Sequence, residues 1–537
     1  MSKSLRVPSS WVSISTVLTV VLIVPILLII VNAFGAQSDT LIHLKETVLS
    51  DYIINTLVLL AGVCSLSLIF GVGSAYFITF YDFRFSKFFS IVLILPFIIP
   101  SYILGFVYSD ILGFYGPIHL LLKEFGVKGF FDVLNMKSVI IILALALYPY
   151  IYLIVKSSFS KHSSYLLNPA LSLGVGKIKI FYRVILPLSR PAIIGALSLV
   201  MMETISEYGL VKYFGVDTLS TAIFTAWFGL NDSNSAAYIS TIAMGIVFTI
   251  LIIEKLNRGG ARYKVESVSS PIKKIKTTSF GQFFILLFIS IPFIFGFLVP
   301  IVWILIYSFE HYSLILDEEF IQTVFNSFFV AFISALSIVS IAVILGYSTR
   351  IFDNKYMKFL LKIATLGYSI PGAVIAVGVI ILSNNIDHFL IDNLHLDELF
   401  LGGTIAILCF AYTVRFLAVA LNSVESSFEK VGINVNKASR SLNKSFLTTL
   451  IKIDLPLIKS GLFAGFILVF IDILKELPAT LILRPFNYET LATKTYELAS
   501  IEMVQESSVY ALSIVLISII PIIYTLKDTN EKHTHTK

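Results

Sequence analysis

The stretch "NPALSLGVGKIKIFYRVILPL" at residues 168–188 has a second copy, "KASRSLNKSFLTTLIKIDLPL", at residues 437–457. In both copies a Ser-Leu pair leads to Gly174 or Asn443, and a proline follows thirteen residues later. The two copies lie 269 residues apart, which is half of this 537-residue chain. The chain is therefore predicted to consist of two halves that repeat one pattern.

Shorter sequence matches between the two halves, at a similar distance along the chain, support the repeat. "NTL" at Asn55 corresponds to "NSF" at Asn326, and "IPSYILG" around Pro100 corresponds to "IPGAVIAVG" around Pro371. Because each half contains an even number of predicted spans, both halves have the same orientation in the membrane. This is a parallel repeat, in contrast to the inverted repeats of many secondary transporters.

The composition predicts a polytopic membrane protein. Hydrophobic residues make up 57% of the chain and charged residues only 13%, too few charges to cover a soluble surface. Apolar runs of about twenty residues recur without strand-like alternation, which predicts membrane-spanning helices. We predict twelve spans, at 12–34, 53–80, 88–110, 138–156, 191–211, 236–254, 280–308, 326–349, 363–383, 401–422, 461–483 and 508–526.

The positive charges predict the orientation. Most of the 39 Lys and Arg fall on the side that carries both termini and the repeated loops, so this side is expected to be cytoplasmic. The net charge of +6 is then a topological asymmetry and does not indicate nucleic-acid binding. The predicted architecture is all-α: a six-helix half at 1–265, a cytosolic linker at 266–279 and a second six-helix half at 280–537. The two bundles are expected to face each other across a pseudo-twofold axis along the membrane normal.

The repeated cytosolic loop predicts a docking element. A short helix is expected to end at Gly174 or Asn443, since these residue types suit the left-handed conformation that closes a helix. An amphipathic segment follows, and Pro187 or Pro456 limits how it continues into the next span. A short surface helix presented twice suits a pair of identical cytosolic subunits. The alternative is an ordinary structured loop.

These loops resemble the coupling motif of binding-protein-dependent ABC importer permeases, which reads Glu-Ala-Ala, three residues, Gly, nine residues, Ile-x-Leu-Pro. Both copies keep the spacing, but Asn168 and Lys437 replace the acidic residue and Asn443 replaces the second glycine. By this resemblance the ATPase-coupling residues are Asn168, Pro169, Ala170, Gly174, Leu186, Pro187, Lys437, Ala438, Ser439, Asn443, Leu455 and Pro456.

The chain further resembles the ferric-iron branch of these permeases, with branch-like stretches at 202–230 and 475–503. The resemblance implies the type I (MetI-like) permease fold in a bacterial inner membrane. It implies two copies of a separate ATPase, which binds the ATP, and an extracytoplasmic ferric-iron-binding protein. This chain itself is expected to bind no cofactor or nucleic acid and to catalyse no reaction. Its role would be to translocate iron(III) by alternating access.

Four carboxylates in the predicted spans are candidates for the substrate path. Asp472 and Glu476 correspond at the repeat distance to Glu203 and Glu207. Each pair is spaced i, i+4, which predicts that its two carboxylates share one helix face. A carboxylate facing lipid costs at least about 2.5 kcal/mol, so water, a counter-ion or a cation is expected beside them. They are predicted to favour a hard cation, the alternatives being that they hold a gate closed or lie near the outer interface.

Basic residues and a proline accompany these carboxylates. Lys475 and Arg484 are possible counter-ions, and Pro478 is expected to interrupt its helix beside a cavity. Arg415 is expected to lie toward the cytosolic end of its span, where it would snorkel or bond a neighbouring carbonyl. No metal site can be assigned firmly from the sequence.

Other functions remain open at this point. "GVGK" at 174–177 lacks the first glycine of a Walker A motif, since residue 171 is Leu, so the chain is not expected to bind ATP. The same class of permease could carry thiamine, a polyamine or an oxyanion. An ion-coupled secondary transporter would also use buried carboxylates, but that class does not account for the paired loops.

Overall fold

The computed structural model describes residues 9–35, 38–126, 132–172, 177–258, 274–352, 354–394 and 400–534. Within these ranges eleven helices are long and apolar enough to cross a membrane, which confirms the prediction of an all-α polytopic protein. The twelfth predicted span, 508–526, falls in α24 (Val504–Thr534), whose apolar part is described as far as Ile519. That span stays a prediction.

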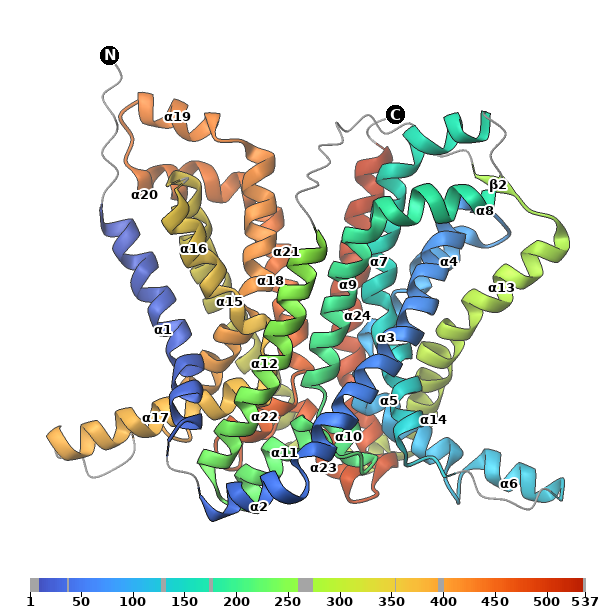
Figure 1. Ribbon diagram of the computed structural model, residues 1–537, viewed down its shortest axis with the longest axis horizontal. Coiled ribbons are helices and arrows are strands. Elements are labelled where there is room, and N and C mark those ends of the chain that lie inside the picture. Colours follow the sequence, from blue (N-terminus) through green and yellow to red (C-terminus); the bar gives the residue numbers. More distant parts are fainter. Residues whose placement is uncertain are drawn as a thin grey trace.

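Helices account for nearly all of the regular structure in those ranges (Figure 1). The helices of the first half are α1 (Ser9–Ala33), α2 (Asp39–Thr47), α3 (Leu49–Phe80), α4 (Ser86–Val92), η1 (Leu95–Ile98), α5 (Ser101–Leu112), α6 (Pro117–Glu124), α7 (Met136–Ser172), α8 (Lys177–Ile180), η2 (Phe181–Ile185), α9 (Leu186–Ser206), α10 (Gly209–Tyr213), α11 (Leu219–Phe224), η3 (Thr225–Gly229) and α12 (Ser233–Arg258). Those of the second half are α13 (Ser279–Phe293), η4 (Ile294–Leu298), α14 (Val299–Ile315), α15 (Glu318–Ile351), α16 (Lys355–Ala364), η5 (Leu366–Ser369), α17 (Gly372–Leu394), α18 (Ile405–Val431), α19 (Asn434–Ser441), α20 (Phe446–Thr449), η6 (Leu450–Asp454), α21 (Leu455–Leu474), α22 (Pro478–Leu483), α23 (Leu491–Ser500) and α24. A parallel pair of two-residue strands, β1 (Tyr81–Asp82) and β2 (Ile275–Lys276), joins the end of α3 to the segment before α13.

The predicted spans 88–110 and 363–383 are broken at equivalent places in the two halves. The first consists of α4, the 3₁₀ turn η1 and α5, and the second of α16, the 3₁₀ turn η5 and α17. In each break an isoleucine in extended conformation precedes a proline, Pro100 or Pro371. Proline disfavours helical backbone in the residue before it and lacks an N–H, so the break follows from the sequence in both halves.

Three other prolines locally widen a helix instead of breaking it. The π-helical turns η2, η4 and η6 each end two residues before a proline, at Pro187, Pro300 and Pro456. The proline ring clashes with the carbonyl four residues earlier and offers no N–H to it. The i to i+5 bonding of a π turn accommodates this loss. The first and last of these turns are repeat equivalents.

The first helix of each sequence half packs against the other half. α1 contacts α16 and α17, and its Ile29 is fully buried beside Gly378 of α17. In the same way α13 contacts α3 and α14 contacts α5. Each of the two large hydrophobic clusters therefore contains side chains from both sequence halves. The two hydrophobic clusters therefore do not correspond to the two halves of the sequence.

The two copies of the repeated loop lie at one end of the molecule. In Figure 1, α8 of the first copy and α19 and α20 of the second lie at the top, whereas α2, α6 and α23 lie at the bottom. Most of the long apolar helices run between these two ends, whereas α17 extends sideways near the bottom (Figure 1). Both loops can thus be reached from the same side of a membrane.

Candidate functional site

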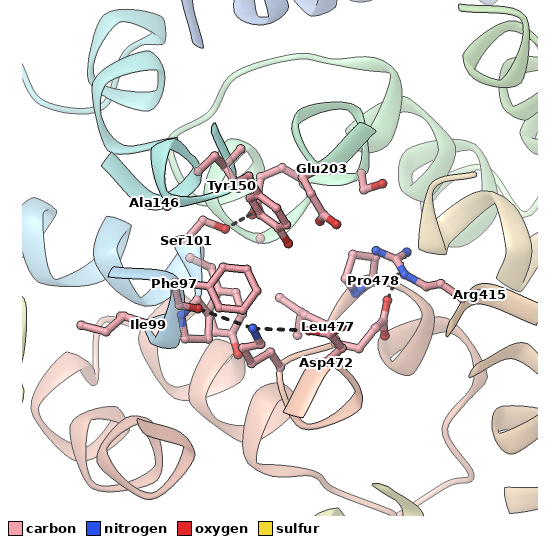
Figure 2. Close-up of a pocket in the computed structure, with 18 of the residues that line it drawn as sticks. Phe97, Ile99, Ser101, Ala146, Tyr150, Glu203, Arg415, Asp472, Leu477 and Pro478 are labelled. Carbon is pink, nitrogen blue, oxygen red and sulfur yellow. Dashed lines mark hydrogen bonds and ion pairs between the residues drawn. The ribbon is translucent and has the colours of Figure 1, made fainter. Parts of the chain in front are cut away.

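A cavity of about 130 Å³ lies where the two halves meet, and all four predicted path carboxylates line it (Figure 2). The first half contributes residues from η1, α5, α7 and the end of α9. The second half contributes residues from η5, α18, the end of α21 and the segment that leads into α22. The helix breaks caused by Pro100, Pro371 and Pro478 all border this cavity or its lining residues.

The four carboxylates are not arranged as the i, i+4 spacing predicted. α9 ends at Ser206, so Glu203 is helical and Glu207 is not. α21 ends at Leu474, so Asp472 is helical and Glu476 is not. The prediction of a shared helix face was therefore wrong, because both helices end between the paired residues. The carboxylates still reach one cavity, since the chain turns back toward it after each helix end.

Glu207 and Glu476 cap the short helices that follow them. The Glu207 carboxylate accepts a hydrogen bond from the backbone N–H of Leu210 at 2.9 Å and another from the Ser101 hydroxyl. The Glu476 carboxylate accepts from the N–H groups of Ala479 and Thr480, both at 3.0 Å. Unpaired N–H groups at a helix start favour a carboxylate. These two equivalent residues therefore have a structural role in addition to lining the cavity.

Arg415 is a buried member of the site. It is only 9% exposed, lies at the cavity and forms an ion pair with Glu476 at 3.6 Å. The prediction that it snorkels was wrong, because Glu476, a buried carboxylate from the segment between α21 and α22, pairs with it. At the repeat distance its counterpart is Ala146, which also lines the cavity, so this cation is present in the second half only.

The break before α17 provides the space for this ion pair. A Cβ at Gly372 would overlap the Arg415 guanidinium and lie 2.5 Å from a Glu476 oxygen. In the "IP" repeat the equivalent of Gly372 is Ser101, whose hydroxyl bonds Glu207. In the first half the Ser101 hydroxyl donates to the capping Glu207, and in the second half the Arg415 guanidinium pairs with the capping Glu476.

Lys475 supplies the second positive charge at the cavity. Its ammonium group lies 3.6 Å from Asp472 and 4.2 Å from the centre of the Phe97 ring. The expectation that Lys475 is a counter-ion of these carboxylates agrees with this geometry. Arg484, the other residue proposed for that role, pairs with Glu489 instead. As predicted, Pro478 interrupts the helix: it opens α22 after a three-residue break that borders the cavity.

The aromatic side of the cavity was not predicted from the sequence. Tyr150 of α7 and Tyr368 of η5 line it, together with Phe97, whose ring packs edge-on against Tyr150 at 5.0 Å. Tyr368 lies two residues before the "IPG" sequence and Phe97 two residues before the "IPS" sequence, so the proline breaks were the available signal. Tyr150 lies in an apolar helix where nothing in the sequence distinguishes it from a packing residue.

The second copy of the predicted coupling loop is described in full. Lys437, Ala438 and Ser439 lie in α19, and Asn443 follows with a φ of 59°. The prediction that Asn443 adopts the left-handed conformation after a short helix is confirmed. Leu455 and Pro456 are the first two residues of α21.

The first copy differs in the described residues. Asn168, Pro169 and Ala170 continue the long helix α7 and do not form a separate short helix, so that prediction was wrong for this copy. Leu186 and Pro187 begin α9, the arrangement found for Leu455 and Pro456 in the second copy. Gly174 lies outside the described residues.

Arg350 ties α19 to the membrane helices. Its guanidinium donates to the Asn436 side chain of α19 and lies 3.8 Å from the fully buried Asp454. It also donates to the carbonyls of Phe428 and Gly432 at the end of α18. Asn436 in turn donates to Asp454 at 2.7 Å. This network, which was not predicted from the sequence, fixes the position of α19 against α15, α18 and the start of α21.

Comparisons with known proteins agree with this architecture. Residues 67–254 match the family model described as "Binding-protein-dependent transport system inner membrane component". This match includes the first copy of the repeated loop and supports the resemblance to ABC importer permeases. Together with the eleven candidate spans, it agrees with a multi-pass membrane protein.

The relatives along most of the chain are ferric-transport permeases. The "Fe(3+)-transport system permease protein FbpB 2" of Haemophilus influenzae is 26% identical, over 96% of this chain and 98% of that protein. The "Putative ferric transport system permease protein FbpB 1" of the same organism is 22% identical, over 86% of this chain and 75% of that protein. The "Ferric transport system permease protein FbpB" of Actinobacillus pleuropneumoniae is also 22% identical, over 80% of this chain and 64% of that protein. These relatives are transport permeases and not enzymes.

Proposed function

We propose that this chain is the transmembrane permease of an ATP-driven importer that carries iron(III). One observation supports this most directly: carboxylates from both halves converge on a single cavity where the halves meet. Carboxylate oxygens suit a hard cation. The near full-length similarity to ferric-transport permeases favours iron over other hard cations.

The cavity carries a net negative formal charge, which favours a cationic substrate. Glu203, Glu207, Asp472 and Glu476 contribute four negative charges, against two positive charges from Arg415 and Lys475. Both positive charges are already paired with carboxylates of the cavity. An anionic substrate would have to displace these pairs and face the remaining carboxylates.

Two copies of a separate ATPase are proposed to bind the loops at 168–188 and 437–457. The α19 region supports this because it combines basic residues with exposed apolar side chains: Leu442 is 73% exposed and Ile433 is 44% exposed. Exposed apolar surface of this kind, next to Lys437, is typical of a protein interface. ATP would bind to those subunits, and their closure would move the two halves relative to each other.

The remaining parts of the system follow from this assignment. The end with α19 would face the cytoplasm, with both termini on that side, in a bacterial inner membrane. An extracytoplasmic ferric-iron-binding protein would dock at the opposite end, where α2, α6 and α23 lie (Figure 1). The chain itself would hold no resident cofactor.

Reconstitution tests this function. The permease and its ATPase are placed in liposomes, and ATP hydrolysis and iron uptake are measured with candidate binding proteins loaded with iron(III), thiamine or a polyamine. Acceleration by the iron-loaded protein supports the proposal. Acceleration only by a loaded organic cation would replace the cargo, and uptake without any ATPase would indicate a secondary transporter.

A pair of variants links the cavity to the cargo. Glu203→Gln combined with Asp472→Asn is expected to lower iron uptake by about tenfold or more, since a loss of roughly 1.4 kcal/mol in binding corresponds to tenfold. Glu310→Gln, at an exposed position on α14, is the matched control and is expected to leave uptake unchanged. Normal uptake in the double variant would contradict a cation path through this cavity.

A further inference from the structure

The cavity offers fewer available carboxylates for a cation than the sequence suggested. Glu207 and Glu476 are engaged by backbone N–H groups and by Ser101 and Arg415. The carboxylates left for a substrate are those of Glu203, in α9, and Asp472, in α21. In Figure 2, Glu203 points into the cavity from one side and Asp472 lies on the opposite side. Two carboxylates alone would be a sparse oxygen set for a trivalent cation.

Two phenols complete the set of hard oxygen donors. Tyr150 and Tyr368 line the same cavity and are half-buried. Tyr150, Glu203, Tyr368 and Asp472 all line this one cavity of about 130 Å³, so their side chains surround a common space. Phenolate oxygen, like carboxylate oxygen, is a hard, negatively charged ligand that suits iron(III). The first half contributes Tyr150 and Glu203, and the second half contributes Tyr368 and Asp472.

A third phenol indicates that the cavity is built for a polar occupant. Tyr102 lines the cavity and is only 3% exposed, yet its hydroxyl has no hydrogen-bond partner in the described part of the chain. A buried hydroxyl without a partner costs about 1–3 kcal/mol, so water or a ligand is expected to satisfy it. A Cβ at Gly209 would lie 2.9 Å from the Tyr102 side chain, so Tyr102 packs beside the start of α10, the helix that Glu207 caps. It can therefore bond water that fills the space around a cation held by the other four residues.

We propose that iron(III), in passage, is bound by Tyr150, Glu203, Tyr368 and Asp472 at the interface of the two halves. This inference rests on the proposed iron transport. Each phenol gives up its proton to water as its oxygen binds the metal, so two protons are released per ion. Lys475, which lies beside Asp472, is displaced from that carboxylate and retains its contact with the Phe97 ring.

The origin of the ligands explains how such a site could release its cargo. Each half supplies one phenolate and one carboxylate, so separation of the halves at either end splits the set into two pairs. A pair of ligands binds iron(III) more weakly than four. The Lys475 ammonium group can then pair again with the Asp472 carboxylate that the iron has left.

Iron(III) phenolate coordination has a specific signature, a ligand-to-metal charge-transfer absorption in the visible range. The purified permease is titrated with iron(III) nitrilotriacetate and its visible spectrum is recorded. The native protein is expected to develop this band, Tyr150→Phe and Tyr368→Phe each to lose part of it, and the double variant to lose all of it. Because carboxylates do not produce the band, Glu203→Gln should shift its iron dependence to higher concentration.

Tyr152→Phe is the matched control, since Tyr152 lies on the same helix, is fully buried and bonds the Ser90 carbonyl away from the cavity. Its band should equal that of the native protein. The inference is overturned if the native protein gives no band, or if the double phenylalanine variant keeps it. Iron-stimulated ATP hydrolysis measured on the same variants separates the two proposals. Normal iron-stimulated hydrolysis in the double variant would rule out the tyrosine site and leave the proposed function intact. Absence of iron-stimulated hydrolysis in the native protein would rule out the proposed function itself.

Discussion

The ion pair between Arg415 and Glu476 allows a quantitative test of how the cavity is stabilised. The two charged groups lie 3.6 Å apart, and their side chains are 10% and 2% exposed. At an effective dielectric constant of about 20, Coulomb's law gives an attraction of about 5 kcal/mol at this distance. Desolvation offsets part of this attraction, and removal of one partner of a buried pair typically costs about 3–5 kcal/mol.

We expect Arg415→Met to lower the free energy of unfolding by about 3 kcal/mol, at the low end of that range. The reason is that Glu476 keeps its hydrogen bonds from Ala479 and Thr480, which stabilise its charge after the guanidinium is lost. Glu476→Gln alone is expected to be destabilising as well, because it removes the carboxylate that pairs with the buried Arg415. The double variant should be more stable than the sum of the two single changes predicts.

The assay is equilibrium unfolding in mixed micelles, followed by tryptophan fluorescence, on the native protein, both single variants and the double variant. The double-mutant cycle isolates the pairwise term. Arg84→Met, at an exposed position, is the control and should change stability by no more than about 0.5 kcal/mol. A coupling energy near zero would refute the reasoning, since it would mean that the two charges do not stabilise each other.

Three further changes test other parts of the structure. Gly372→Ala should displace the Arg415 guanidinium and lower the Tm measured by fluorescence. Gly245→Ala is the control, because a Cβ there meets open space, and it should not lower the Tm. Equal Tm values for the two variants would contradict the tight fit at Gly372. Lys475→Met should raise the affinity of the purified permease for iron(III) in equilibrium dialysis, because a competing positive charge is removed, and an unchanged or lower affinity would contradict that role. Arg350→Ala should reduce the stimulation of ATP hydrolysis by loaded binding protein by about tenfold, because hydrogen bonds from a charged group contribute roughly 1.5–3 kcal/mol each. The ATPase should still co-purify with that variant, and full stimulation would show that α19 needs no such support.

The sequence by itself determined the class of fold and the position of the repeated elements. Long apolar runs can satisfy their backbone only as helices in a membrane, so the all-α polytopic fold followed from composition and run length. The left-handed Asn443 and the interruption at Pro478 followed from local chemistry, because each depends on the residue at that position and its immediate neighbours. The helix breaks at Pro100 and Pro371 belong to the same group, although the predicted spans ran through them.

Tertiary structure decided which groups meet at the cavity and what each of them does there. The i, i+4 spacing predicted the same role for Glu203 and Glu207. Because α9 ends between them, Glu207 caps the next helix, and the Glu203 carboxylate remains available to a substrate in the cavity. Arg415 and Tyr368 are brought there by separate elements, α18 and η5. Such contacts join residues far apart in the chain and depend on how helices pack, so no local pattern encodes them. The packing of α1 against the second half has the same origin, because it depends on the complementarity of two apolar surfaces and not on any one segment.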